Sequence, residues 1–269
     1  IFTSEVCRVE SNGVDRSRSL DERLEKEAKF HDDKYSAGDE HYPKHYSVRP
    51  TEYVYQRMRQ DLGDIRGKRV LEYGCGEGWI TRDLAKMGAL VSAFDVSPQA
   101  IENTRRVLEQ DGLAEQCTLG VMPAERLAYP DSSFDIAVGF AIIHHLDLTT
   151  AFAELHRVLK PGGVAFFAEP LGTNPAIQLY RKLTPQYRTV DERPLVLGEM
   201  PQILRDYKGF THKEYFVTAI GATALAYMPG GVALYPRVSG WMHAFDRGLM
   251  RIAPFLGRFA WYTVLRIEK

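Results

Sequence analysis

Three glycines, Gly74, Gly76 and Gly78, stand close together in the segment VLEYGCGEGW. Glycine lets the backbone turn sharply and leaves no side chain between the backbone and a ligand, so the stretch from Glu72 to Gly78 predicts a strand that turns into a helix around a nucleoside-like molecule. A tight turn made only for packing is the alternative. A dinucleotide site expects G-x-G-x-x-G, and Trp79 replaces its third glycine here.

Two carboxylates stand beside this turn. Glu72 precedes the glycines at the end of a predicted strand, where a carboxylate can approach the cationic amino-acid end of a ligand. Asp95 ends the next predicted strand (VSAFDVS), where it can accept hydrogen bonds from a ribose diol. Together they indicate a nucleoside that carries an ammonium group.

These residues resemble the first two motifs of the class I S-adenosylmethionine-dependent methyltransferases, which are acidic-x-G-x-G-x-G and an acidic residue at the end of the second strand. The resemblance continues through MPAERLAYPDSSFDIAVGFAIIHHL and ELHRVLKPGGVAFFAEP, and so covers Val70 to Glu169. The second segment is similar to small-molecule enzymes of the ubiquinone-biosynthesis type. The resemblance implies S-adenosyl-L-methionine as the cofactor, held by Glu72, Gly74, Cys75, Gly76, Asp95, Val96, Ala124, Glu125, Phe140 and Tyr46.

One position departs from the family pattern. Many relatives carry an Asp just before the Ala-Glu pair, where it accepts from the adenine amino group, and Pro123 stands there in this chain. Adenine recognition is therefore expected from the backbone of Ala124, from Glu125 or from another group, and these alternatives stay open.

Three residues are candidates for catalysis. Methyl transfer from a sulfonium is an in-line displacement, so the protein mainly aligns the reactants and excludes water, and a base is needed only if the acceptor must lose a proton. His144 and His145 follow the predicted fourth strand and Glu169 ends the fifth, at the edge of the sheet where the methyl group is expected. The alternative is that each of them caps a strand end.

The segment before the core is expected to form a lid. Leu20 to Tyr35 has the spacing of an amphipathic helix that needs a host surface, and Thr51 to Leu62 predicts a second helix with Thr51 as its N-cap. In related enzymes the N-terminal segment folds over the cofactor. We therefore expect the methionine carboxylate to meet Tyr42, Tyr46 or Arg49, with a solvated loop as the alternative.

From Arg69 to Val217, short apolar runs alternate with helical patterns. This alternation predicts an α/β fold with a Rossmann-like, doubly wound, seven-stranded and mostly parallel sheet that has helices on both faces. The predicted strands are Arg69 to Tyr73, Leu90 to Asp95, Cys117 to Val121, Phe134 to Phe140, Val164 to Glu169, Lys213 to Val217 and Phe259 to Ile267. The predicted helices between them are Gly78 to Met87, Pro98 to Gln110, Thr149 to Leu159 and Met200 to Tyr207.

We divide the chain into an N-terminal tail and lid helix (1–50), a cofactor-binding core (51–220), a cap inserted before the last strand (221–258) and the last core strand (259–269). The aromatic and methionine side chains of the cap indicate either a core or subunit contact, or an acceptor pocket for an apolar or aromatic molecule such as a terpenoid, quinone or polyketide. Candidates for the border of the acceptor entrance, with a solvated surface as the alternative, are Gly172, Asn174, Arg181, Lys182 and Arg188.

Lys plus Arg total 34 against 35 for Asp plus Glu, and the formal net charge of -1 gives no electrostatic reason to expect nucleic acid or an anionic membrane as a partner. The cysteines at positions 7, 75 and 117 have neither disulfide nor metal-ligand spacing, and no run approaches the roughly 18 apolar residues of a spanning helix. Because the chain opens at Ile1 without a methionine, we expect a trimmed terminus.

The sequence therefore predicts a cytoplasmic methyltransferase of small-molecule or secondary metabolism with no metal, acting on a small acceptor. A homo-oligomer through the N-terminal helix or the cap is left open. The alternatives are a nicotinamide-dependent oxidoreductase and a non-catalytic nucleoside-binding protein.

Overall fold

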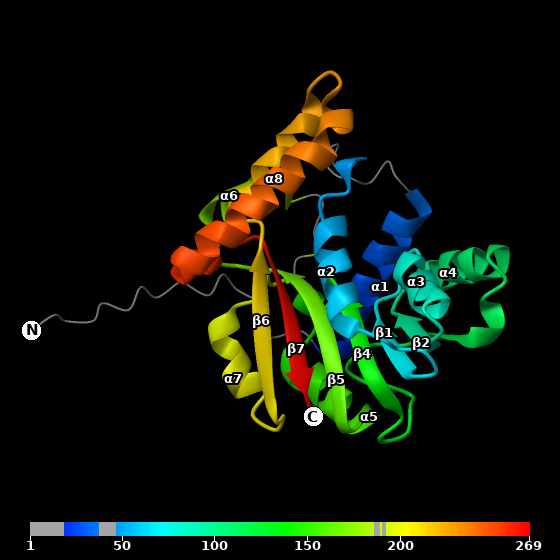
Figure 1. Cartoon of the computed structure of the whole chain (residues 1–269). Helices are drawn as coiled ribbons and strands as arrows, with labels where there is room; N and C mark the ends of the chain where they lie inside the picture. The colour runs from blue at the N-terminus through cyan, green and yellow to red at the C-terminus, as the bar shows by residue number, and fades with distance from the viewer. Residues whose placement is uncertain (1–18, 38–46, 186–188, 190–191) are drawn as a thin grey trace, which may run out of the picture.

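The computed structural model describes residues 19–37, 47–185, 189 and 192–269, and its centre is a seven-stranded sheet with the order β3-β2-β1-β4-β5-β7-β6 (Figure 1). The strands are β1 (Arg69–Tyr73), β2 (Leu90–Asp95), β3 (Cys117–Val121), β4 (Phe134–Phe140), β5 (Leu159–Pro170), β6 (Gly209–Tyr215) and β7 (Tyr262–Glu268). Strands β1 to β5 pair in parallel, and β7 runs antiparallel between β5 and β6. The predicted seven-stranded, mostly parallel sheet is confirmed.

Helices cover both faces of the sheet. They are α1 (Leu20–Ala37), α2 (Glu52–Leu62), α3 (Trp79–Lys86), α4 (Pro98–Gln110), α5 (Leu148–Val158), α6 (Pro175–Leu183), α7 (Met200–Ile203) and α8 (Gly231–Ile252), with short 3-10 helices η4 (Ile143–His145), η7 (Ala219–Tyr227) and η8 (Pro254–Phe259). Alternate strand residues point to opposite faces, so Val70 and Val138 pack in the core with α2, α3 and α4, while Leu71 and Ala137 pack with α5.

Some predicted boundaries are wrong. The strand predicted at Lys213 to Val217 is Gly209–Tyr215, because the backbone turns at Phe216, whose φ is 65°. The helix predicted at Met200 to Tyr207 ends at Ile203, since the chain must then turn to enter β6. Thr51 precedes α2, but its side chain makes no capping hydrogen bond.

The predicted cap contains one long helix, α8, that the sequence analysis did not assign. In Figure 1 α8 lies beyond the edge of the sheet where β6 ends and β7 begins, and this is also the edge where β5 ends, since Tyr262 pairs with Pro170. Within the part of the chain that the structure describes, no helix has the length and apolar character needed to cross a bilayer.

Candidate active site

The glycine-rich turn connects β1 to α3 and packs directly against its neighbours. Gly78 has a φ of +77°, and a Cβ there would lie 2.8 Å from the Cα of Thr104, a residue of α4. Gly76 has a φ of +53°, and a Cβ there would lie 2.9 Å from the Tyr35 hydroxyl of α1. Side chains are therefore disfavoured at both positions by the positive φ, and at Gly78 also by the backbone of Thr104.

Asp95 connects this turn to the end of β2. Its Oδ2 accepts from the backbone N–H of Gly76 and its Oδ1 from that of Ser97, each at 3.0 Å. A carboxylate has about four acceptor positions, so two remain for a ligand diol. Burial raises the pKa of Asp95, which favours a partner that donates to the carboxylate.

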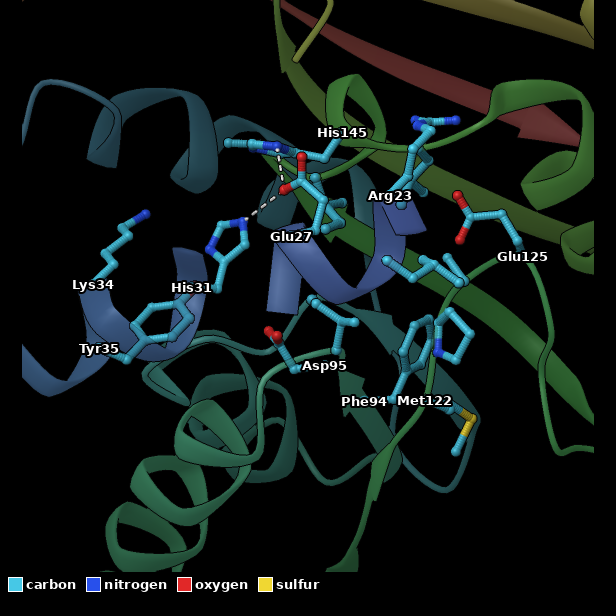
Figure 2. A pocket seen from close by; sticks show the side chains of 18 of the residues that line it. Arg23, Glu27, His31, Lys34, Tyr35, Phe94, Asp95, Met122, Glu125 and His145 are labelled. Atoms are coloured by element: carbon cyan, nitrogen blue, oxygen red, sulfur yellow. Dashed lines mark ion pairs between the residues drawn. The ribbon is translucent and has the colours of Figure 1, made fainter. Parts of the chain in front are cut away.

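A cavity of about 170 Å³ opens at the carboxyl ends of β1, β2 and β4, and α1 lies over it (Figure 2). Six of the predicted cofactor residues line it: Gly74, Asp95, Val96, Ala124, Glu125 and Phe140. Cys75 and Gly76 belong to the turn beside it. Tyr46 and Tyr42 lie outside the described residues, as does Arg188.

One end of the cavity is mostly apolar, with Met122, Pro123 and Ala124 among its lining residues. Glu125 stands at this end. Its Oε1 accepts from the backbone N–H of Asp147 at 2.9 Å, whereas its Oε2 is buried with no hydrogen-bond partner among the described residues. An apolar slot with one unused acceptor oxygen fits an adenine ring and its amino group. Pro123 stands where many relatives carry the Asp that accepts from this amino group, and the carboxylate of Glu125 lies nearby.

Glu72 lies deeper than expected. Its side chain is 2% exposed, it does not line the cavity, and its Oε2 has no hydrogen-bond partner among the described residues. Burial raises the pKa of Glu72 to about 8. At neutral pH Glu72 is therefore mostly protonated in the cofactor-free protein, and its side chain does not reach the cavity.

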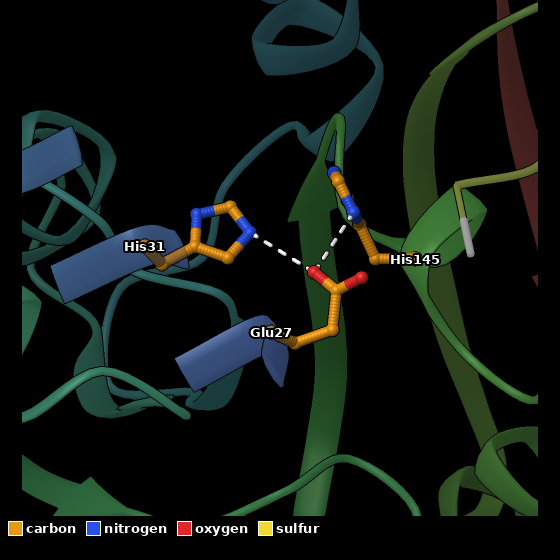
Figure 3. Close-up of side chains that lie close together, drawn as sticks. All are labelled: Glu27, His31 and His145. Atoms are coloured by element: carbon orange, nitrogen blue, oxygen red, sulfur yellow. Dashed lines mark ion pairs between the residues drawn. The ribbon is translucent and has the colours of Figure 1, made fainter. Parts of the chain in front are cut away.

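Glu27, from α1, joins the lid to the loop that follows β4 (Figure 3). Its Oε2 lies 3.4 Å from Nε2 of His31 and 3.3 Å from Nδ1 of His145. Burial works to raise the pKa of Glu27, but its contacts with His145 and His31 outweigh burial and hold the pKa well below its ordinary value. The carboxylate is thus ionised and holds two imidazoles, one from each side of the cavity.

His144 and His145 have different surroundings although they are adjacent. His145 lines the cavity, and burial together with the neighbouring His144 lowers its pKa. The ring of His144 points to Glu169, with Nδ1 and Oε2 at 2.7 Å. Of the two, His145 is in the better position to meet an acceptor.

Glu169 is fully buried and does not line the cavity. Its Oε1 accepts from the backbone N–H groups of Ile142 and Ile143 at 2.8 and 3.0 Å, and its Oε2 contacts His144. These contacts agree with the alternative considered for Glu169, a strand-end cap, and they fix the loop that carries both histidines.

Among the described residues, two groups of side chains could hold a metal ion: Glu27 with His31 and His145, and His144 with His145 and Glu192. In each group the potential ligand atoms lie within 4.8 Å of one another. Direct contacts between carboxylate and imidazole groups also explain both groups without a metal. The expectation that the protein holds no metal therefore stays a prediction.

The sequence analysis missed the polar residues of α1. Glu27, His31, Lys34 and Tyr35 all line the cavity. Their spacing of four, three and one residues puts them on one face of the helix, in continuation of Leu20 and Leu24, which was the available signal. Arg49, expected in the lid, is exposed.

The residues expected at the acceptor entrance are not all solvated. Arg181 forms an ion pair with Glu192, and the side-chain amide of Asn174 donates to the backbone carbonyl of Phe259. Gly172 donates its backbone N–H to the carbonyl of Leu195. These contacts join the segment after β5 to residues 192–195, which precede α7, and to the last residue of η8.

Comparisons with known proteins agree with this geometry. Residues 71–167 match the family model described as a methyltransferase domain. The chain is 29% identical over 184 residues to the ubiquinone biosynthesis O-methyltransferase of Methylocella silvestris, covering 68% of this chain and 68% of that protein. It is 26% identical over 188 residues to the demethylmenaquinone methyltransferase of Chlorobaculum tepidum, covering 69% of this chain and 66% of that protein. The chain thus spans about two thirds of the length of these two relatives.

Among solved structures, the geranyl diphosphate C-methyltransferase of Streptomyces coelicolor has the same fold, with a TM-score of 0.62 at 11% identity over 91% of this chain and 97% of that one. The glycine-rich turn, the carboxylate after β2 and the matched domain agree with one another. Residues 71–167 thus form a methyltransferase domain, and the chain resembles the class I S-adenosylmethionine-dependent methyltransferases of the small-molecule type, enzymes that take their methyl group from S-adenosylmethionine.

Proposed function

We propose that this chain transfers the methyl group of S-adenosylmethionine to an apolar acceptor of the quinone or isoprenoid class, in the cavity between α1 and the carboxyl ends of the parallel strands. The observation that carries the proposal is the arrangement of the cavity: Asp95 and an apolar slot on one side, and His145 on the other. The two curated relatives are named for methylation in ubiquinone and menaquinone synthesis, which supports the acceptor class.

The residues of the chain have distinct parts in binding. Asp95 would accept from the ribose, and Glu125 would accept from the adenine amino group through its free Oε2. Ile142 and Tyr35 fill the space beside Gly74 and Gly76 in this structure, so these two side chains would have to move before the amino-acid end of the cofactor could approach the turn. The cofactor supplies an electrophilic methyl group, so the protein mainly has to align the acceptor and keep water out.

The acceptor class is also supported by a cluster of aromatic rings, of which Phe140 lines the cavity and the others pack behind it. Phe140 lines the cavity, and its ring centroid lies 5.8 Å from that of Trp79 and 6.0 Å from that of Tyr262. Tyr55 contacts both Trp79 and Phe140 from α2. These rings suit a flat or apolar acceptor and offer little to a highly charged one.

His145 is proposed as the group that orients the acceptor or takes its proton. Its lowered pKa keeps the imidazole neutral near pH 7, the form that accepts a proton. Glu27 would hold the ring in place and stabilise the imidazolium once the proton has moved. His144 and Glu169 would position this loop from behind.

The helix α1 is proposed as a lid that moves. The cavity of about 170 Å³ is smaller than the roughly 300 Å³ of the smallest usual ligand sites, so the cofactor needs α1 to shift outward before it can occupy the site fully. The contact of Glu27 with His145 is the polar link that would open and close.

The proposal is tested by incubating the protein with S-adenosylmethionine labelled on its methyl group and with demethylated quinones that carry short isoprenoid tails. Label that enters the organic phase supports it, and label in a quinone hydroxyl rather than a ring carbon would identify O-methylation. If no label enters the organic phase from any quinone or from an isoprenoid alcohol, the acceptor class is wrong.

Three further expectations remain proposals of the same kind. They are the division at residues 50, 220 and 258, the cytoplasmic location, and the lack of a nucleic-acid partner. The cysteines at positions 75 and 117, described as free thiols, support a reducing compartment.

A further inference from the structure

The exposed side of α8 carries large apolar side chains that nothing in the described chain covers. The exposed fractions are 52% for Leu234, 81% for Trp241, 61% for Phe245 and 87% for Ile252. At about 100° per residue, positions 234, 241, 245 and 252 fall within about 20° of one line along the helix. These four residues form a straight apolar stripe, which we call the α8 stripe.

The opposite side of the same helix faces the protein. Tyr235, Ser239, His243 and Asp246 are buried there, and the ring of His243 stacks on Tyr53 of α2 at 3.6 Å between centroids. A surface helix normally has one apolar face, which packs on the core, and a polar face towards water. Because α8 carries apolar side chains on its outer face as well as on the face that packs on the core, the outer stripe indicates that a second apolar surface binds there.

The charges around the α8 stripe identify the chemistry of that surface. Between Ala219 and Phe259 the charged residues are Arg237, Arg247, Arg251, Arg258 and Asp246, four positive and one negative. Asp246 is 2% exposed and accepts hydrogen bonds from the backbone N–H groups at 217, 218 and 219, so its charge is used internally.

The arginines of α8 lie along one flank of the stripe. On the same helical projection, Arg237, Arg251 and Arg247 are rotated from the stripe by about 60°, 100° and 140° in one direction. Arg247 also donates to the Tyr53 hydroxyl at 2.7 Å. The net charge of -1 for the whole chain therefore hides a locally basic, apolar surface.

We propose that the α8 stripe and its arginines dock this chain onto an anionic lipid surface. Aromatic and aliphatic side chains can enter the boundary between headgroups and acyl chains while arginines contact anionic headgroups, as in helices that lie in the plane of a membrane. A second copy of the chain is disfavoured as the occupant, because its own α8 carries the same arginines and its one acidic residue, Asp246, is buried and cannot pair with them. The docked surface is at the same edge of the sheet as the ends of β5 and β6.

Docking of this kind complements the proposed function without depending on it. An apolar acceptor dissolves in a bilayer, and a chain held on the bilayer by α8 would collect it from there. The inference holds whether or not the acceptor is a quinone, since it rests on the exposed residues of α8 alone.

The test is co-sedimentation of the protein with vesicles of phosphatidylcholine, with and without phosphatidylglycerol. We expect binding to the vesicles that contain phosphatidylglycerol, weakened by salt. The double variant W241S/I252S should bind at least about tenfold more weakly. The variant R237E/R251E should bind at least about thirtyfold more weakly.

Matched control variants lie far from α8. Leu90 is 53% exposed at the start of β2, and the side chain of Arg205 is 77% exposed after α7. L90S and R205E should bind vesicles like the wild type. Binding of S-adenosylhomocysteine, measured by calorimetry, shows that each α8 variant is folded and separates a docking defect from a failure of the proposed function.

Tryptophan fluorescence gives a second readout. Trp241 is far more exposed than Trp79 (36%) or Trp261 (8%), so its emission should shift to the blue on anionic vesicles. The W241F variant should still bind but lose most of the shift. The proposal is overturned if the wild type ignores anionic vesicles, if the controls lose binding equally, or if sedimentation velocity shows a dimer that W241S/I252S dissociates.

Discussion

The carboxylate of Glu27 lies 3.3 Å from Nδ1 of His145, across a separation of more than a hundred residues in the chain. This contact joins the lid helix α1 to the loop that follows β4, at the edge of the sheet where the cofactor is proposed to bind. The lid and the proposed acceptor-orienting group are therefore held by the same interaction.

Replacing Glu27 with Gln should loosen the lid. The variant keeps the shape of the side chain but removes the carboxylate charge that lies 3.4 Å from Nε2 of His31 and 3.3 Å from Nδ1 of His145, and with it the electrostatic attraction between the lid and the loop after β4. We expect amide hydrogen exchange in α1 to become about ten- to a hundredfold faster, measured by mass spectrometry without cofactor. Glu25 is exposed on the same helix, so E25Q is the control. Unchanged exchange in E27Q would mean that α1 is held by other contacts.

Replacing His145 with Asn should lower kcat by about 10²- to 10⁴-fold if the acceptor loses a proton in the reaction. His156 is a half-buried histidine on α5, and H156N should change kcat less than about twofold. If H145N keeps full activity on the identified acceptor, His145 has no part in proton transfer.

The pH profile of the wild type tests the same residue independently. Because burial and His144 lower the pKa of His145, the neutral base persists below pH 6.5, and kcat/KM should fall only at pH values lower than that. An acid limb above pH 7 would contradict the assignment.

Glu72 should make the stability of the cofactor-free protein depend on pH. Its folded-state pKa of about 8 lies above the ordinary value of 4.5, so the folded protein retains a proton that the unfolded chain releases. The free energy of unfolding therefore falls as the pH rises from 4.5 to 8, by an amount on the order of 4 kcal/mol. Urea unfolding at pH 5 and pH 8 measures the difference.

The variant E72Q cannot release this proton and should lose most of the pH dependence, becoming more stable than the wild type at pH 8. Glu102 is a part-exposed carboxylate on α4, and E102Q should keep the wild-type profile. Equal pH profiles for E72Q and the wild type would show that the Glu72 carboxylate is ionised at neutral pH in the folded protein.

The first four strands were predicted to the residue because each is a short run rich in apolar residues between segments of a different pattern, and β1, β2 and β4 are also largely buried. The last strands were displaced because their ends depend on tertiary contacts, as at Phe216. The helix α8 was missed because glycines and Pro236 interrupt it and its apolar residues lie on two faces, which obscures the helical period.

The candidate site shows the same division. Asp95 and the glycines were identifiable from spacing alone, since they lie on consecutive strand ends. The roles of Glu27 and His31 could not be identified from the sequence. The position of α1 over the sheet decides whether a polar residue on this helix faces the cavity or the solvent. His144 and His145 are adjacent in sequence, and only the fold separates the one that faces Glu169 from the one that faces the cavity.

Titration calorimetry with S-adenosylhomocysteine measures directly whether S-adenosylmethionine binds beside Asp95. Wild-type protein should bind one molecule per chain, and D95N should bind about ten- to a hundredfold more weakly, since one charged acceptor for the ribose is lost. Asp135, which accepts from the Arg69 backbone N–H at the opposite edge of the sheet, supplies the control D135N, with affinity near that of the wild type. Absence of binding by the wild type, or equal affinity of D95N and the wild type, would contradict the account.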